Sequence, residues 1–150
     1  MNVKTLKALE REIEIRIKTA LATDVAKAVS DVMVDHIVQD VYDAYEPFQY
    51  ERRWDEGGLL DPDNIQSTLI GDTLIIENMT VGNPYIGGGM GISKNDGQYI
   101  AGIIETGVGY DTKFNMKRPF IHNTKYDLFT HKYHVSAMKQ GLKRLGLEVK

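Results

Sequence analysis

The chain has 150 residues, of which 42% are hydrophobic and 26% are charged, and its formal net charge is −3. This length and composition indicate one globular domain with a modest core, and the negative charge argues against a chain built as a whole to bind polyanions. Cysteine is absent, which excludes disulfides, thiolate catalysis and cysteine-ligated metal sites. The N-terminal segment lacks the apolar run of a signal peptide, and no window approaches the roughly 20 apolar residues of a membrane span. We therefore expect no membrane association.

The first predicted element is helical and runs from Lys4 to about Ala44, because its apolar residues recur at steps of three and four. Thr23 or Asp24 could cap a new helix within this run. The pattern therefore allows either two consecutive helices or one long helix with a weak point near Thr23. Glu46 precedes a proline and should end the helix, because that position is pushed out of the α region.

The middle of the chain predicts short strands. Residues from Phe48 to Trp54 alternate in places and read as one strand. Ile65–Ile70 and Thr73–Val81 are rich in β-branched residues and flank the tight-turn pair Gly71-Asp72, which predicts a hairpin.

The last third of the chain predicts one long helix after a short apolar segment. "QYIAGIIETGVGY" reads as strand or helix and is closed by glycines. A helix then follows from about Asn123 to Leu145, with Asn123 or Thr124 as its cap and Gly146 as its C-terminal stop. The whole order predicts an α+β fold: a long N-terminal helix packed with a C-terminal helix on a small antiparallel sheet with long loops.

The glycine-rich stretch "NPYIGGGMGISKNDGQYI", residues 83–100, does not fit a phosphate-binding loop. The residue spacing matches neither a Walker A loop nor a dinucleotide fingerprint, and the βαβ context is missing. Glycine supplies backbone freedom, so we interpret the loop as mechanical and predict that it is mobile from about Gly82 to Gln98.

Three histidines suggest an alternative function. His131 and His134 lie three apart, on one face of the predicted last helix, and His122 is near them in the sequence, so together they could bind a metal in a small hydrolase. No glutamate follows His131 as in H-E-x-x-H, and histidines that are solvated or packed explain the pattern equally well. We expect no catalytic residues, no metal ligands and no cofactor.

A basic and aromatic cluster consists of Tyr50, Arg52, Arg53 and Trp54. It could bind nucleic acid, but the carboxylates of Glu51, Asp55 and Glu56 surround the arginines and cancel most of their field. Arginine, tyrosine and tryptophan are enriched at protein interfaces, so we predict a protein contact. The alternative is that Trp54 covers the core while the arginines pair with neighbouring carboxylates.

Two parts of the sequence resemble a known family. "VYDAYEPFQYERRWDEGGLLDPDNI" resembles a segment of small structural proteins of phages of Gram-positive hosts. "YIAGIIETGVGY", followed by "RPFIHNT" and a helix ending in "LKRLG", resembles the tail-completion, or head–tail joining, family of long-tailed phages. The corresponding motif positions are Glu105, Gly107, Arg118, Pro119 and Phe120. The match divides a single domain, 1–150, into an N-terminal helical extension, 1–22, and a tail-completion-like core, 23–146.

The resemblance implies a non-enzymatic virion protein of the neck. It would form a homo-oligomeric ring, commonly a hexamer, between the head connector and the tail tube or tail terminator, and DNA would pass through the bore without specific binding. The virion would be assembled in the host cytoplasm. The predicted contacts are the cluster Tyr50, Arg52, Arg53 and Trp54 and the loop residues Gly87, Gly88, Gly89, Met90 and Gly91.

Overall fold

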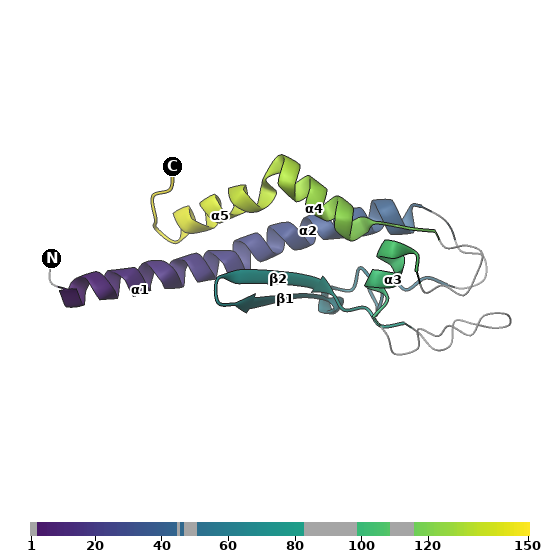
Figure 1. The fold of residues 1–150 in the computed structure, drawn as a ribbon, viewed down its shortest axis with the longest axis horizontal. Coiled ribbons are helices and arrows are strands. Elements are labelled where there is room, and N and C mark those ends of the chain that lie inside the picture. The colour runs from purple at the N-terminus through teal and green to yellow at the C-terminus, as the bar shows by residue number, and fades with distance from the viewer. Residues whose placement is uncertain (1–2, 45, 47–50, 83–98, 109–115) are drawn as a thin grey trace.

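The computed structural model confirms the predicted α+β fold and describes residues 3–44, 46, 51–82, 99–108 and 116–150. A long helical rod runs through the molecule, a two-stranded hairpin lies on one side of it, and the C-terminal helices lie on the other (Figure 1). The first three residues of the strand predicted from Phe48 to Trp54 and residues 83–98 of the glycine-rich loop lie outside the described residues, so the predicted mobility of that loop stays a prediction. No described helix is long and apolar enough to cross a membrane.

The rod is one continuous helical segment with two π-helical turns. Its parts are α1 (Val3–Ala20), the π turn η1 (Leu21–Val25), α2 (Ala26–His36) and a second π turn, η2 (Ile37–Tyr42). At about 1.5 Å per residue, the rod is on the order of 60 Å long.

The π turn η1 lies where the sequence predicted a weak point near Thr23. The prediction that Thr23 or Asp24 caps a new helix there is wrong. The Thr23 hydroxyl donates to the carbonyl of Thr19, 2.8 Å away, instead of accepting from a new helix. Threonine that bonds back to the preceding turn bends or loosens a helix without ending it, so the rod continues through this point.

The hairpin forms at the predicted turn, Gly71-Asp72. Asp61 accepts from the N–H of Asp63 and caps a short 3-10 helix, η3 (Pro62–Asn64). Strands β1 (Ile65–Ile70) and β2 (Thr73–Asn78) then pair antiparallel around Gly71, whose φ of +60° suits glycine. The second strand ends at Asn78, short of the predicted end at Val81.

The predicted single C-terminal helix is wrong, because it breaks into α4 (Phe120–His131) and α5 (Tyr133–Arg144). Lys132 adopts the left-handed conformation, with φ 58°, and turns the chain between the two helices. The break lets α4 pack on α2 while α5 follows the rod back to η1. Gly146 ends α5 as predicted: its φ is +83°, and the N–H of Leu147 reaches back to the carbonyl of Leu142.

The N-terminus of α4 is capped from a distant element. Helix α3 (Ala101–Thr106) carries Glu105, whose carboxylate accepts from the N–H groups of Ile121 and His122 at 2.8 and 3.0 Å. Neither predicted cap, Asn123 or Thr124, has this role: Thr124 bonds the carbonyl of Phe120. A carboxylate at a helix N-terminus also interacts favourably with the helix dipole. Glu105 therefore connects α3 to the start of α4.

The core lies where α2, η2, α3 and α4 meet. Phe120, the first residue of α4, is fully buried there. The buried residues of this core are Met33, Ile37, Val41, Tyr42, Leu59, Ala101, Ile104 and Phe120.

Candidate assembly surfaces

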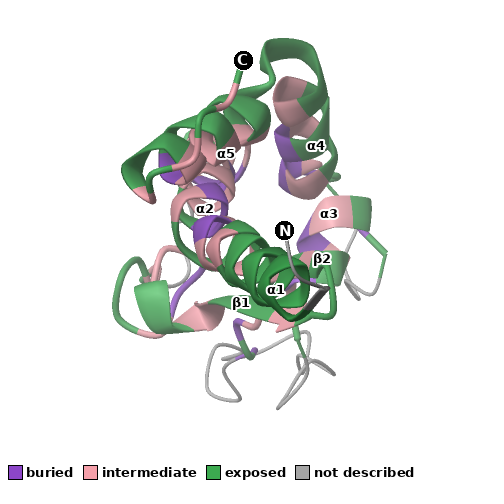
Figure 2. Cartoon of the chain, turned by 90° about the vertical axis from the view of Figure 1, so that its left-hand side faces the viewer, coloured by how far each residue is buried: buried purple, intermediate pink, exposed green. Residues whose placement is uncertain are grey.

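The N-terminal part of the rod, residues 4–17, is an uncovered helix that we call the arm. Four of its apolar side chains lie on one face, because they are spaced by three and four residues. They are Leu6, Leu9, Ile13 and Ile17, between 36% and 46% exposed. Figure 2, which views the molecule from this end, shows α1 largely exposed, whereas buried residues gather on α2, α4 and α5. The arm therefore carries an apolar stripe that the described part of the chain leaves in contact with water.

The cover of the rod begins where α5 meets η1. Ala20 continues the spacing of the apolar stripe but is fully buried. Gly141 of α5 lies so close that an added Cβ would be 3.0 Å from the Cβ of Ala20. Arg144 then donates to Asp24 at 2.7 Å, and this bond lowers the pKa of the Asp24 carboxyl. The same helical face is thus packed from Ala20 onward and open before it.

A second exposed apolar surface lies at the break between α4 and α5, and we call it the elbow. It combines aromatic rings with lysines, all exposed: Lys125, Tyr126, Phe129, Lys132 and Tyr133. The Lys132 ammonium lies 4.0 Å from the centre of the Phe129 ring, which itself is 72% exposed. Large aromatic rings that gather in contact with water are typical of a surface that binds a partner.

The predicted cluster at residues 50–54 folds onto the end of the rod. The Trp54 ring stacks on Tyr42 with centroids 4.4 Å apart, and the Arg52 guanidinium lies over the same tyrosine at 5.3 Å. The Tyr42 hydroxyl donates to the carbonyl of Arg53 at 2.6 Å and accepts from the N–H of Leu59 at 3.3 Å. Burial raises the pKa of this phenol, so it stays protonated and able to donate.

Both arginines of the cluster bind the chain's own backbone. Arg52 donates to the carbonyl of Tyr42, and Arg53 donates to that of Val81 at 2.7 Å. Their backbone does not form the predicted strand, since these bonds and the close approach of Gly58 fold it into an irregular loop. Trp54 remains 48% exposed. The contact role of Arg52, Arg53 and Trp54 stays a prediction, and Tyr50 and residues 87–91 lie outside the described residues.

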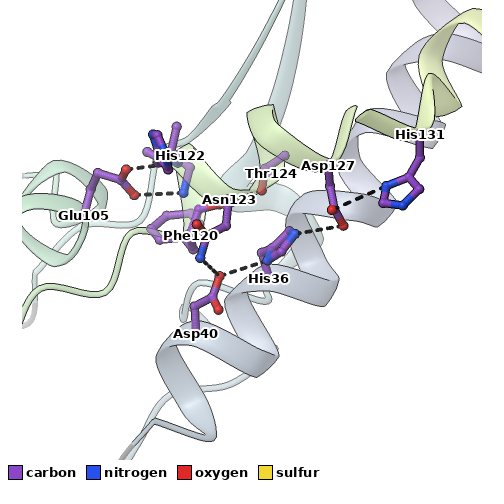
Figure 3. A network of polar contacts seen from close by, with 10 residues as sticks. His36, Asp40, Glu105, Phe120, His122, Asn123, Thr124, Asp127 and His131 are labelled. Carbon is purple, nitrogen blue, oxygen red and sulfur yellow. Dashed lines mark hydrogen bonds and ion pairs between the residues drawn. The ribbon is translucent and has the colours of Figure 1, made fainter. Parts of the chain in front are cut away.

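A largely buried histidine connects α4 to α2 (Figure 3). The Nδ1 atom of His36 lies 2.9 Å from a carboxylate oxygen of Asp40, and its Nε2 atom lies 3.2 Å from Asp127 on α4. Asn123 donates to the same Asp40 oxygen at 2.9 Å, and His131 lies 3.5 Å from Asp127. Each ring nitrogen of His36 thus has a carboxylate partner, which makes the network a clamp between the two helices.

The geometry assumed for the alternative function, a histidine metal site, is wrong. His131 and His134 do not share a helical face, because the left-handed Lys132 separates α4 from α5. The backbone N–H of His122 binds Glu105 at the other end of α4. Within the described ranges, no three histidine, aspartate or glutamate side chains come together as metal ligands. The sequence prediction missed His36, although its spacing of four from Asp40 was a signal for a helical pair.

Comparison with known proteins places the chain in a phage context. A family model described as YomN matches residues 5–144. The SPbeta prophage-derived uncharacterized protein YomN of Bacillus subtilis (strain 168) is 28% identical over 152 residues, which cover 97% of this chain and 96% of that protein. No solved structure matches. The protein is therefore phage-related, and the matched region includes α1 from residue 5, which the sequence prediction had set apart as an extension.

Proposed function

The chain belongs to the YomN family, and on this premise we propose that it is a non-enzymatic structural protein of a phage particle. In this proposal, copies of the chain form a ring at the head–tail interface, between the head connector and the tail tube or tail terminator. DNA passes through the bore without specific binding. The protein is located in the virion and is assembled in the host cytoplasm.

The observation that carries the proposal is the apolar stripe of the arm. An isolated helix of this length is marginal in water, and burying a continuous stripe of leucine and isoleucine would lower the free energy. In a subunit that assembles, a partner covers such a stripe. The arm lies at one end of the elongated molecule, where it can reach a neighbouring subunit (Figure 1).

Among the residues that the structure describes, no contact supports either alternative function. A hydrolase that uses His122, His131 and His134 would need these side chains together, and the break at Lys132 divides them. A nucleic-acid-binding module would need guanidinium groups directed at phosphates, whereas Arg52 and Arg53 donate to backbone carbonyls.

The test is a phage that encodes the protein with a disrupted stripe. Replacing Leu6 and Leu9 with aspartate should leave separate DNA-filled heads and separate tails in electron micrographs, because the ring cannot form. The control is Ile15→Asp, which changes a more exposed isoleucine on a different face of the same helix and should give joined particles.

The proposed location has its own readout. Purified wild-type virions should contain the protein by mass spectrometry, in a fixed number of copies per particle. Absence from the virion, or normal joined particles from the Leu6 and Leu9 variant, would overturn the proposal.

A further inference from the structure

We propose that the exposed surface of α4 and α5, with the elbow at its centre, binds single-stranded nucleic acid without reading its sequence. The two helices lie on the side of the rod away from the hairpin (Figure 1). The inference goes beyond the proposed function, in which DNA passes without specific binding, and it requires no ring. It also concerns a different surface from Arg52 and Arg53, whose guanidinium groups donate to backbone carbonyls.

Basic residues are concentrated in the C-terminal part of the chain. Residues 116–150 hold eight lysine and arginine residues and two acidic residues, although the whole chain has a net charge of −3. Helix α5 has no acidic residue, and the one carboxylate of α4, that of Asp127, lies 3.2 Å from the His36 ring on α2. Such an asymmetry gives one side of a protein a positive potential that attracts polyanions, even when the net charge is negative.

The lysines of this surface are not neutralised. On the rod, Lys18 and Lys27 pair with carboxylates one helical turn away. Within the part of the chain that the structure describes, four exposed lysines of α4, the elbow and α5 have no such carboxylate partner: Lys125, Lys132, Lys139 and Lys143. The last two lie about 160° around α5 from Gly141, which packs against Ala20, so they point away from the rod. Ammonium groups without a carboxylate are available to phosphates.

Aromatic rings stand in water among these lysines. Tyr126, Phe129 and Tyr133 are 65%, 72% and 44% exposed. The Lys132 ammonium lies 4.0 Å from the centre of the Phe129 ring, and the Tyr133 ring stacks on that of His131 with centroids 5.2 Å apart. Unpaired bases stack on such rings whatever their sequence, because every base has a π face. The elbow therefore presents cations and stacking surfaces together.

The kind of cation favours nucleic acid over an acidic protein. Protein interfaces are enriched in arginine, whose fork pairs with carboxylates, and depleted in lysine. Here the four cations without a carboxylate partner are lysines, and the neighbouring Arg144 is bound to Asp24 at 2.7 Å. Lysine is a point charge that suits phosphates of any sequence. A duplex hides the faces of its bases, whereas a single strand offers both phosphates and bases to this surface.

The test is fluorescence anisotropy of a labelled oligothymidylate titrated with the purified protein at several salt concentrations. We expect binding that weakens as salt rises. Phe129→Leu keeps an apolar side chain but removes the ring, so it should weaken binding at least about fivefold without changing the salt dependence. Lys139→Gln with Lys143→Gln should instead lower the slope of log K against log salt by about 1.4, since each phosphate contact on a single strand contributes about 0.7.

Two matched controls lie outside the surface. Lys27→Gln removes a lysine that is 76% exposed but paired with Asp31, and Ile70→Ala shortens an apolar side chain that is 62% exposed on the hairpin. Both should bind like the wild type, and circular dichroism shows that each variant is folded. The proposal is overturned if no binding occurs at low salt or if the controls lose as much affinity as the surface variants. Tighter binding of a duplex than of the single strand, or equal displacement of the oligonucleotide by polyglutamate, would also overturn it.

Discussion

The two halves of the rod have similar sequence patterns and opposite surroundings. In α1 the apolar positions recur at helical spacing and remain exposed, whereas in α2 and η2 the same kind of spacing places Met33, Ile37 and Val41 in the core. The difference is which elements pack on the rod: the hairpin and the C-terminal helices reach it only from about Arg16 onward. Helical periodicity therefore determines which residues share a face, and tertiary packing determines whether that face is buried.

The largest expected effect is a difference in the free energy of unfolding between a substitution in the core and one in the arm. Phe120→Ala empties a fully buried site beside the covered half and should lower the free energy of unfolding by about 3–5 kcal/mol. Leu9→Ala in the arm should change it by less than about 0.5 kcal/mol, because the side chain is already in water. Urea denaturation of both variants measures the contrast. Similar losses for the two substitutions would show that the arm is covered in the free protein.

The loop that closes the C-terminal end of the rod depends on one hydroxyl. Tyr42→Phe removes the bond to the Arg53 carbonyl and leaves that acceptor and the Leu59 N–H without the phenol, so we expect a loss of about 1–3 kcal/mol. Tyr126→Phe is the matched control, since that ring is 65% exposed and its loss of a hydroxyl should not alter stability. Thermal melts that fail to distinguish the two variants would contradict the role of Tyr42.

The cap of α4 should contribute a smaller amount. Glu105→Ala leaves the N–H groups of Ile121 and His122 without their carboxylate, at a cost of about 0.5–2 kcal/mol. Hydrogen exchange at these two amides should become faster than in the wild type. Glu77→Ala, on the exposed side of β2, serves as the control and should leave both rates unchanged.

The smallest effect lies at the boundary between the two halves and depends on pH. The bond from Arg144, together with that from Thr23, lowers the folded-state pKa of Asp24 below its unfolded value. The carboxylate therefore stabilises the fold at neutral pH, and this contribution is lost as the pH falls through the folded-state pKa. The stability difference between wild type and Asp24→Asn should accordingly shrink in acid. In an Arg144→Leu background most of this pH dependence should disappear, and its persistence there would contradict the pairing.

Local sequence signals predicted the parts of the fold that local chemistry controls. Gly71-Asp72 between β-branched runs gave the hairpin, Gly146 gave the end of α5, and helical spacing gave the rod. The break at Lys132 carries no such signal, because neither lysine nor its neighbours "HKYH" disfavour a helix strongly. It follows from packing: α4 is held on α2 by Phe120 and the His36 clamp, while α5 approaches Ala20 closely at Gly141.

The candidate surfaces, too, were predictable from the sequence only in part. The sequence singled out Arg52, Arg53 and Trp54 as a cluster, but only the fold shows that Tyr42 and Val81 are their binding partners. Glu105 and Phe120 came from the family resemblance, and the structure adds the physical reason, since one caps the helix that the other anchors. The exposure of the apolar stripe on the arm and of the aromatic rings at the elbow was not predictable from the sequence. Whether a side chain is exposed depends on which elements pack against it in the fold.

The π turn η1 has a geometric consequence for the direction in which the arm presents its stripe. A π turn holds one more residue than an α turn, so it rotates everything before it by about 100° about the rod axis relative to a regular helix. Removing one residue, such as Ala22, would restore regular winding and swing the leucines of α1 around the axis while leaving them helical. The single extra residue at Leu21–Val25 therefore determines in which direction, around the rod axis, the apolar stripe of the arm faces relative to the core.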